Sequence, residues 1–261
     1  MSNQDRAARE QAGKERAGRE QAALNSPAKR ITIEVCVDDI DVARAAVDAG
    51  ADRLEINSRL DLDGLTPADN LVTESVRLGV PVIAMARPDT ANNRFTAAGF
   101  CYSEVDKRRL VQDADRVLQL GAHGIAAGAL LADGAVDEPF LQELREICTG
   151  RQLVFHRAFD VCEDWRRALV SIVRGGADRL LTSGCAMKAE QGVPVLAEMV
   201  ERDEIEILPA SGISSANAET IVKQTGCSQI HGSFSSAAIG TGTGPERVAA
   251  RIRELRVLFP R

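Results

Sequence analysis

The stretch IVRGGADRLLT at residues 172–182 shows a helix passing into a strand, because helical periodicity ends at a glycine and an apolar run follows. AVDAGADRLEI at 46–56 and VLQLGAHGIAA at 117–127 repeat this pattern. A glycine that closes a helix just before a strand is typical of strand–helix units repeated around a parallel sheet. These joints therefore indicate the α/β class.

Short apolar runs alternate with helical stretches from Ile31 onward, which extends the pattern along the chain. No glycine-rich dinucleotide fingerprint follows the first strand, so a single closed (β/α)8 TIM barrel is favoured and no nucleotide cofactor is indicated. Active sites of such barrels lie at the carboxyl ends of the strands. We predict strands at 31–37, 52–57, 81–87, 122–127, 152–157, 178–182, 205–209 and 228–232.

The first residues differ from the rest of the chain. Ala, Arg, Glu, Gln and Gly dominate 1–29, and AGKER at 12–16 is echoed by AGREQ at 17–21. With almost nothing apolar to bury, this segment is predicted to be a charged tail, disordered or helical, rather than an oligomerisation arm. We therefore divide the chain into the tail, 1–29, and a TIM-barrel domain, 30–261.

Composition excludes several classes of partner. The 261 residues include 32 basic and 38 acidic side chains, a net charge of −6, which gives no basic footprint for nucleic acid. No apolar stretch approaches the roughly 20 residues of a membrane-spanning helix. The six cysteines form no C-x-x-C pair, and the start of the chain lacks an apolar signal segment, so we expect a cytoplasmic protein with free thiols.

Two predicted strands carry carboxylates on their inner faces. Glu34 and Cys36 alternate with apolar residues in the first strand, as do Glu55 and Asn57 in the second. Because alternate residues of a barrel strand face the lumen, we expect Glu34 and Glu55 to point inward at similar height. A carboxylate removed from water needs a cation, hydrogen bonds or a shared proton, and Arg87 alone could satisfy one of the two.

Basic side chains close two further strands. Arg87 ends the third strand and His156 ends the fifth, where Asp160 in the next loop could orient the histidine ring. With Glu34 and Glu55, these residues predict an acid–base site in which the two carboxyl groups hold different pKa values. A structural ion-pair network is the alternative interpretation.

The other two histidines point to different roles. His231 ends the last predicted strand and fits a site residue as well as a hydrogen-bonded lumen histidine. His123 precedes the fourth strand, at the end of the barrel that serves stability, so a structural role is favoured.

Small residues gather at the ends of the last strands. Loops after the seventh and eighth strands of this fold often bind phosphate through backbone N–H groups, which predicts an anionic ligand here. Helix capping and tight turns explain the same residues equally well. The candidates are Ser183, Gly184, Ser211, Gly212 and Ser233.

Cys36 lies nearest the predicted barrel mouth, two residues beyond Glu34 on the same face. A thiol there is a candidate nucleophile or a ligand for a soft metal such as Cu(I). The alternative is a small buried apolar residue, which is the commoner role of cysteine without a disulfide.

Several segments together resemble the copper homeostasis protein CutC family. The resemblance runs from about Ile31 to Ser233. It implies a cytoplasmic TIM barrel, often a homo-oligomer, that binds copper or takes part in copper homeostasis. The segments are Glu34-Val35-Cys36-Val37, Gly50-Ala51-Asp52-Arg53, Gly64-Leu65-Thr66-Pro67, Arg87-Pro88, Phe100-Cys101-Tyr102-Ser103, Phe155-His156-Arg157-Ala158-Phe159-Asp160 and Leu181-Thr182-Ser183-Gly184.

Three departures from the family pattern bear on a copper site. Asn57 stands where the family usually has a cysteine, so a two-cysteine Cu(I) site at that place is lost. A longer insertion runs from Asp89 through Gly99 and is expected to reshape the mouth. Ala210-Ser211 replaces a Gly-Gly pair near the seventh strand, which would narrow the approach of a ligand to the backbone.

Two functions remain open from the sequence. The resemblance and Cys36 favour a copper-binding protein whose affinity for Cu(I) depends on that thiol. The residue chemistry favours an enzyme, a lyase, isomerase or hydrolase, acting on a small polar or anionic metabolite. In that case Glu34 or Glu55 would act as acid or base with His156, and Arg87 would hold the anion.

Overall fold

The computed structural model describes residues 30–90, 92, 94–235 and 244–261, and its strands form the predicted barrel. All adjacent pairs in the sheet are parallel, in the order β7-β6-β5-β4-β3-β2-β1-β8. At the seam between β7 and β8, Gln229 Nε2 donates to Ile207 O at 3.3 Å. The strands are β1 (Thr32–Val37), β2 (Arg53–Ile56), β3 (Val82–Met85), β4 (Gly124–Ala127), β5 (Gln152–Phe155), β6 (Arg179–Thr182), β7 (Glu206–Pro209) and β8 (Gln229–Gly232).

The TIM-barrel prediction is confirmed, and each predicted strand contains an observed one with ends that differ by at most two residues. The predicted tail, 1–29, lies outside the described residues. The part from Ile31 to Arg261 forms one compact unit. Within the described part of the chain, no helix is long and apolar enough to cross a membrane.

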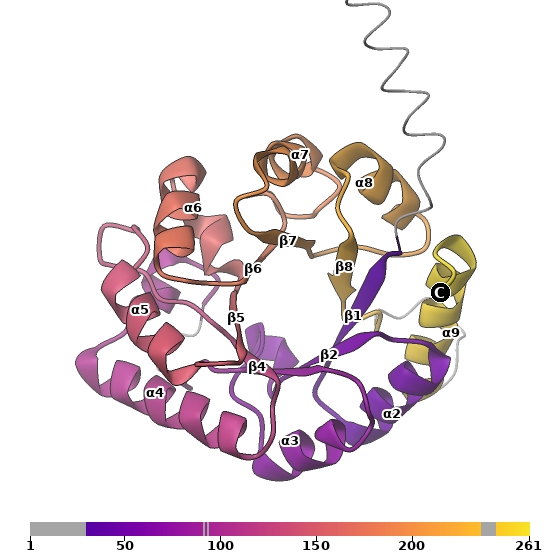
Figure 1. Cartoon of the computed structure of the whole chain (residues 1–261), viewed down its shortest axis with the longest axis horizontal. Helices are drawn as coiled ribbons and strands as arrows, with labels where there is room; N and C mark the ends of the chain where they lie inside the picture. The colour runs from indigo at the N-terminus through magenta and orange to yellow at the C-terminus, as the bar shows by residue number, and fades with distance from the viewer. Residues whose placement is uncertain (1–29, 91, 93, 236–243) are drawn as a thin grey trace, which may run out of the picture. The chain divides into compact units, whose positions relative to one another are not determined.

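Helices surround the strands in Figure 1. They are α2 (Ile40–Ala49), α3 (Asp69–Val76), α4 (Glu104–Gln119), α5 (Glu138–Ile147), α6 (Trp165–Arg174), α7 (Val193–Arg202), α8 (Ala218–Thr225) and α9 (Gly244–Leu258). Short 3-10 helices follow three strand ends: η1 (Leu60–Leu62), η2 (Ala97–Phe100) and η3 (Arg157–Val161).

The glycine joints form as the sequence predicts. Gly50, Gly121 and Gly176 have φ values of 112°, 103° and 81°, in the left-handed region that other residues rarely adopt. The N–H of Gly50 donates to Val47 O at 2.9 Å, which satisfies a carbonyl at the end of α2 before β2 begins. These turns deliver each strand to the barrel after a short connection.

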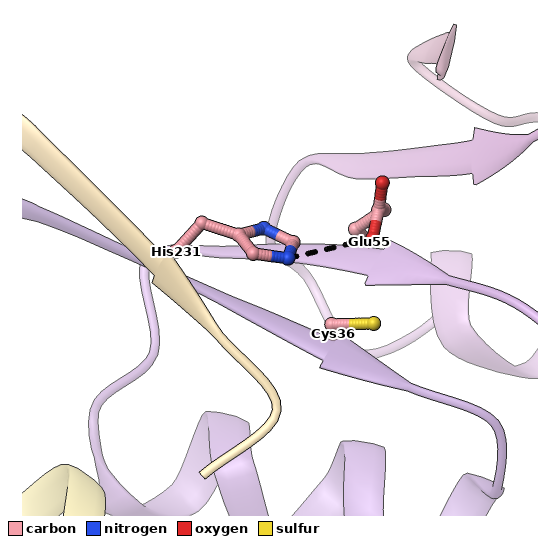
Figure 2. A group of neighbouring side chains, drawn as sticks. All are labelled: Cys36, Glu55 and His231. Atoms are coloured by element: carbon pink, nitrogen blue, oxygen red, sulfur yellow. Dashed lines mark ion pairs between the residues drawn. The ribbon is translucent and has the colours of Figure 1, made fainter. Parts of the chain in front are cut away.

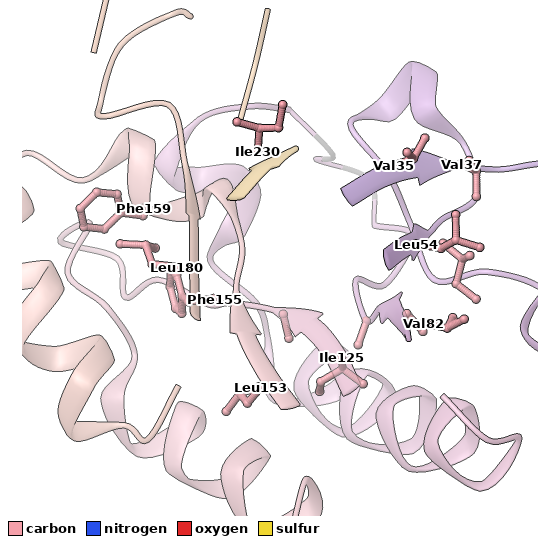
Figure 3. Packing of buried hydrophobic residues seen from close by; sticks show 14 of the residues in the cluster. Val35, Val37, Leu54, Val82, Ile125, Leu153, Phe155, Phe159, Leu180 and Ile230 are labelled. Carbon is pink, nitrogen blue, oxygen red and sulfur yellow. The ribbon is translucent and has the colours of Figure 1, made fainter. Parts of the chain in front are cut away.

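The apolar core lies between the strands and the helices. Figure 3 shows residues such as Val35, Leu54, Ile125 and Leu180 packed in this layer. A second, smaller apolar cluster joins residues of β3 to β7 with Ala210, namely Ile83, Met85, Ala126, Val154, Leu181 and Leu208. Buried charged groups lie outside that cluster, on β1, β2 and β8 and, with Arg179, at the start of β6.

Candidate functional site

Cys36, Glu55 and His231 form a compact group of donor atoms, here called the donor cluster. They come from β1, β2 and β8, all three are buried, and their ligand atoms lie within 4.8 Å of one another. Figure 2 shows the three side chains converging. The register explains this, because Cys36 is level with Glu55 across the β1–β2 pair.

His231 lies between two carboxylates. Its Nδ1 is 2.7 Å from Glu34 Oε1, and its Nε2 is 3.7 Å from Glu55 Oε2. Burial lowers the pKa of His231, but the negative charges of Glu55 and Glu34 outweigh this effect and leave the pKa raised. The sequence left the role of His231 open; the structure places it in the donor cluster.

Glu34 is held ionised by a cation that the sequence analysis did not single out. Arg53 pairs with Glu34 and also donates to Gln229 Oε1 at 2.8 Å. Burial raises the pKa of Glu34, but Arg53 and the hydrogen bond with His231 lower it well below its usual range. Arg53 lies two residues before Glu55 on the same strand, so both side chains face the lumen. This spacing was the signal in the sequence that could have revealed the role of Arg53.

Two expectations about the glutamates are wrong. Glu34 is level with Arg53 rather than with Glu55, so the two carboxylates do not sit at one height. Arg87 neutralises neither of them: its Nη1 donates to Leu62 O at 2.8 Å and to Gly64 O at 3.3 Å. Alternation predicts the face of each side chain, but not the offset between neighbouring strands of a barrel.

The acidic surroundings keep the Cys36 thiol protonated. Burial and the nearby charge of Glu55 raise the pKa of Cys36 well above its usual value. Burial and the charge of Glu34 likewise raise the pKa of Glu55. A thiol in this environment is a poor nucleophile at neutral pH, whereas a bound cation would favour its deprotonation.

A cavity of about 420 Å³ opens above the donor cluster. Cys36, Glu55 and His231 lie on one side of it, and Arg87 and His156 lie on another. Of the predicted small residues at the strand ends, Ser211, Gly212 and Ser233 also line it, while Ser183 and Gly184 are absent from the lining.

Asp160 does not orient His156, contrary to expectation. It accepts hydrogen bonds from Thr182 Oγ1 at 2.5 Å, Ser183 N at 3.0 Å and Cys185 N at 3.2 Å. Arg157 Nε also donates to it at 2.8 Å. The backbone N–H groups after β6, predicted to bind an external anion, therefore already hold a carboxylate of the chain itself.

The comparisons with known proteins agree with the resemblance in the sequence. The model of the CutC family matches residues 31–236. The chain belongs to the CutC family. It is 38% identical to a CutC family protein of Rhizobium meliloti over 87% of this chain and 95% of that protein. A CutC family protein of Treponema denticola is 40% identical, over 78% of this chain and 81% of the relative.

Solved structures give the same family at the level of the fold. The CutC structure from Streptococcus agalactiae, whose name assigns it to copper homeostasis, superposes with a TM-score of 0.70 at 27% identity. It covers 78% of this chain and 98% of its own. Thiamine phosphate pyrophosphorylase from Pyrococcus furiosus, at 17% identity and a TM-score of 0.58, shares the barrel alone over 88% of this chain and 96% of that enzyme.

In this CutC chain Asn57 supports the donor cluster. Its Nδ2 donates to Cys36 Sγ at 3.2 Å and to Glu55 Oε2 at 3.1 Å. Gly64 packs against this amide, and a Cβ at Gly64 would clash with Asn57 Oδ1. The residue in the family's cysteine position therefore acts as a hydrogen-bond donor to the remaining thiol.

The other two departures from the family pattern fall at the cavity. Phe95, within the insertion, and Phe100, just after it, both line the cavity. Ala210 and Ser211 line it from the end of β7. His123 lies away from these groups, where its Nδ1 accepts a hydrogen bond from Val82 N at 3.1 Å, in keeping with a structural role.

Proposed function

We propose that this CutC chain binds a copper ion at the donor cluster, as cargo in copper homeostasis. The observation that carries the proposal is the convergence of a thiol, an imidazole and a carboxylate, all buried and within 4.8 Å of one another. Family membership supports the copper role by name and does not favour the alternative of an acid–base enzyme.

The donor set fits copper chemically. A cysteine thiolate is a soft ligand that favours Cu(I), and imidazole binds copper well. Glu34 accepts a hydrogen bond from His231 Nδ1, which leaves Nε2 facing Glu55 and Cys36. A histidine ligand held by a carboxylate on its other nitrogen is the usual outer-shell arrangement of metal sites.

The charges around the cluster also favour a cation. Glu34 and Glu55 contribute carboxylates to this part of the lumen, and among the described residues Glu34 has an arginine partner, Arg53, whereas Glu55 has none. A bound cation would replace the protons that His231 and Cys36 hold. The N–H of Asn57 would then stabilise the thiolate form of Cys36.

We place this role in a reducing cytoplasm, where copper is carried as Cu(I). All six cysteines lie in the described residues, and no disulfide joins them. Assembly into a homo-oligomer, implied by the resemblance, stays a prediction that light scattering would check.

A competitive Cu(I) titration tests the proposal. Reduced protein is titrated anaerobically against a chromophoric chelator, in a Cys101→Ser background that removes an exposed thiol. We expect tight binding of one copper ion, lost in Cys36→Ser and kept in Cys148→Ser, which removes a buried thiol outside the donor cluster. Equal affinity in the Cys36→Ser protein would refute the proposed site.

A further inference from the structure

The side of the cavity formed by Arg87 and His156 carries hydrogen-bond donors with nothing to bind. Arg87 is 1% exposed and His156 is 3% exposed. Among the described residues, Arg87 Nε, Arg87 Nη2 and His156 Nε2 are buried and have no hydrogen-bond partner. Both side chains line the 420 Å³ cavity. We call this pair the basic pair.

The unpartnered atoms of the basic pair are all donors. An arginine side chain offers five N–H groups and no acceptor. His156 Nδ1 accepts the Ala158 N–H at 3.3 Å, so the neutral ring carries its proton on Nε2. Burial and the charge of Arg87 lower the pKa of His156 to about 3, which keeps the ring neutral at physiological pH.

Arg87 has no counter-charge. No ion pair joins it to a carboxylate in the described part of the chain, and two backbone carbonyls accept from its Nη1. Its guanidinium carbon lies 4.8 Å from the centre of the Phe100 ring, a cation–π contact. The hydroxyl of Tyr102 interacts with Arg87, which lowers the pKa of this residue, but burial raises it to about 12, so the hydroxyl is neutral and supplies no counter-charge.

A buried cation without a partner is costly, which points to an anion that is supplied from outside. Arg157 shows the contrast, because it lines the same cavity and is already paired with Asp160 at 2.8 Å. His156 and Arg87 both contact Phe100, with the two ring centres of Phe100 and His156 5.2 Å apart. The charge of Arg87 also acts on His156, so the two side chains are neighbours in the wall of the cavity.

The rest of the cavity suits the apolar part of an organic ligand. Its wall includes apolar side chains from several loops and strands, which a small inorganic ion would leave uncovered. They are Leu60, Met85, Phe95, Phe100, Leu181, Ile213 and Phe234.

We propose that Arg87 and His156 bind the oxyanion, a carboxylate or a phosphate, of a small organic molecule that occupies the cavity beside the donor cluster. The three donors would give this oxyanion charge-assisted hydrogen bonds in a place removed from water, where such bonds are strong. The inference does not depend on copper binding, because the basic pair shares no residue with the donor cluster.

Calorimetric titration of metal-free protein tests this inference. The probes are phenyl phosphate and benzoate, with benzyl alcohol as the neutral control. We expect saturable binding of at least one of the two anions to one site, and none of the alcohol. Binding should persist in Cys36→Ser, so a failed copper site leaves this result unchanged. Absence of saturable binding of both anions would overturn the inference.

Substitution of the basic pair gives the second arm. Arg87→Lys keeps the charge but loses the paired N–H geometry, so affinity for the bound anion should fall about tenfold or more. Arg166→Gln, which removes an exposed arginine paired with Glu198, should leave the affinity unchanged. If thermal unfolding shows that Arg87→Lys does not fold, His156→Asn serves under the same criterion. Unchanged affinity in the folded variant would overturn the inference.

Discussion

Two histidines on different sides of one cavity have opposite environments. His231 lies between Glu34 and Glu55, and its pKa is raised although burial opposes this. His156 lies beside Arg87, and burial together with that positive charge lowers its pKa to about 3. Both rings are buried and both line the cavity. Burial lowers the pKa of both rings, and the charge of the neighbours either adds to this effect, as at His156, or outweighs it, as at His231.

The difference divides the barrel mouth into two halves. The strands β1, β2 and β8 supply acidic groups and a thiol, which suits a cation. The ends of β3 and β5 supply Arg87 and His156, whose unpartnered atoms are donors and suit an anion.

The largest effect is expected from breaking the ion pair beneath the acidic half. Arg53→Met leaves buried Glu34 without its arginine, so the free energy of unfolding should fall by about 3–5 kcal/mol. Arg87→Met leaves no carboxylate without its partner, so it should lower the free energy of unfolding by less than about 2 kcal/mol. Urea denaturation of both variants measures the two losses. If both variants lost the same free energy of unfolding, the ion pair of Arg53 with Glu34 would not distinguish Arg53 from Arg87.

Copper affinity should depend strongly on pH. The pKa values of Cys36, Glu55 and His231 are all raised, so copper must displace protons at neutral pH. Affinity should therefore rise with pH, by about tenfold per unit for each proton released. Competition titrations at pH 6, 7 and 8, corrected for protonation of the chelator, measure this slope. A flat profile would be inconsistent with these three ligands.

Substitution of Asn57 tests whether its hydrogen bonds to Cys36 and Glu55 support copper binding. Asn57→Ala removes the donor to Cys36 Sγ and Glu55 Oε2 and should weaken Cu(I) binding about 10–100-fold, as for other outer-shell groups. Asn57→Cys adds a second thiol and should strengthen binding instead. The same competition titration ranks the three proteins. If the alanine variant bound copper as well as the unmodified chain, Asn57 would have no part in the site.

The smallest effect concerns the pH dependence of stability on the basic side. The folded-state pKa of His156, about 3, lies below its ordinary 6.5, so only the unfolded chain gains this proton as the pH falls below 6.5. Stability should therefore fall by about 1–2 kcal/mol more in the unmodified chain than in His156→Asn between pH 6.5 and 5.

Denaturant unfolding of both proteins across that range gives the difference. Glu55 and His231 titrate in both proteins, so their contributions to the pH dependence of stability cancel in the comparison. The contribution of Glu34, whose pKa is lowered, is lost only below about 4.5. Parallel stability profiles would mean that His156 is not held neutral in the folded protein.

The fold was predictable because its signals are local. Apolar runs mark the strands, and helix-closing glycines such as Gly50 and Gly176 mark several of the joints before them, within a few residues of one another. Strand alternation also predicted that Glu34, Cys36 and Glu55 face the lumen. The same alternation places Arg53 on the inner face, but its pairing with Glu34 depends on the register between β1 and β2, which the sequence does not contain.

The partners of these side chains were not predictable, because they depend on strand offset and loop path. Asp160 is four residues after His156, yet it binds the turn after β6. Glu34 meets His231, 197 residues along the chain, because β1 and β8 are neighbours in the closed barrel. The sequence contains both residues, but only the register brings them together.

X-ray absorption at the copper edge tests the central claim most directly. Protein with the Cys101→Ser substitution, loaded with one equivalent of Cu(I), should show one sulfur neighbour together with nitrogen or oxygen neighbours. The sulfur should disappear in Cys36→Ser. Two sulfur neighbours, or a sulfur signal that survives this substitution, would contradict a copper site built from Cys36, Glu55 and His231.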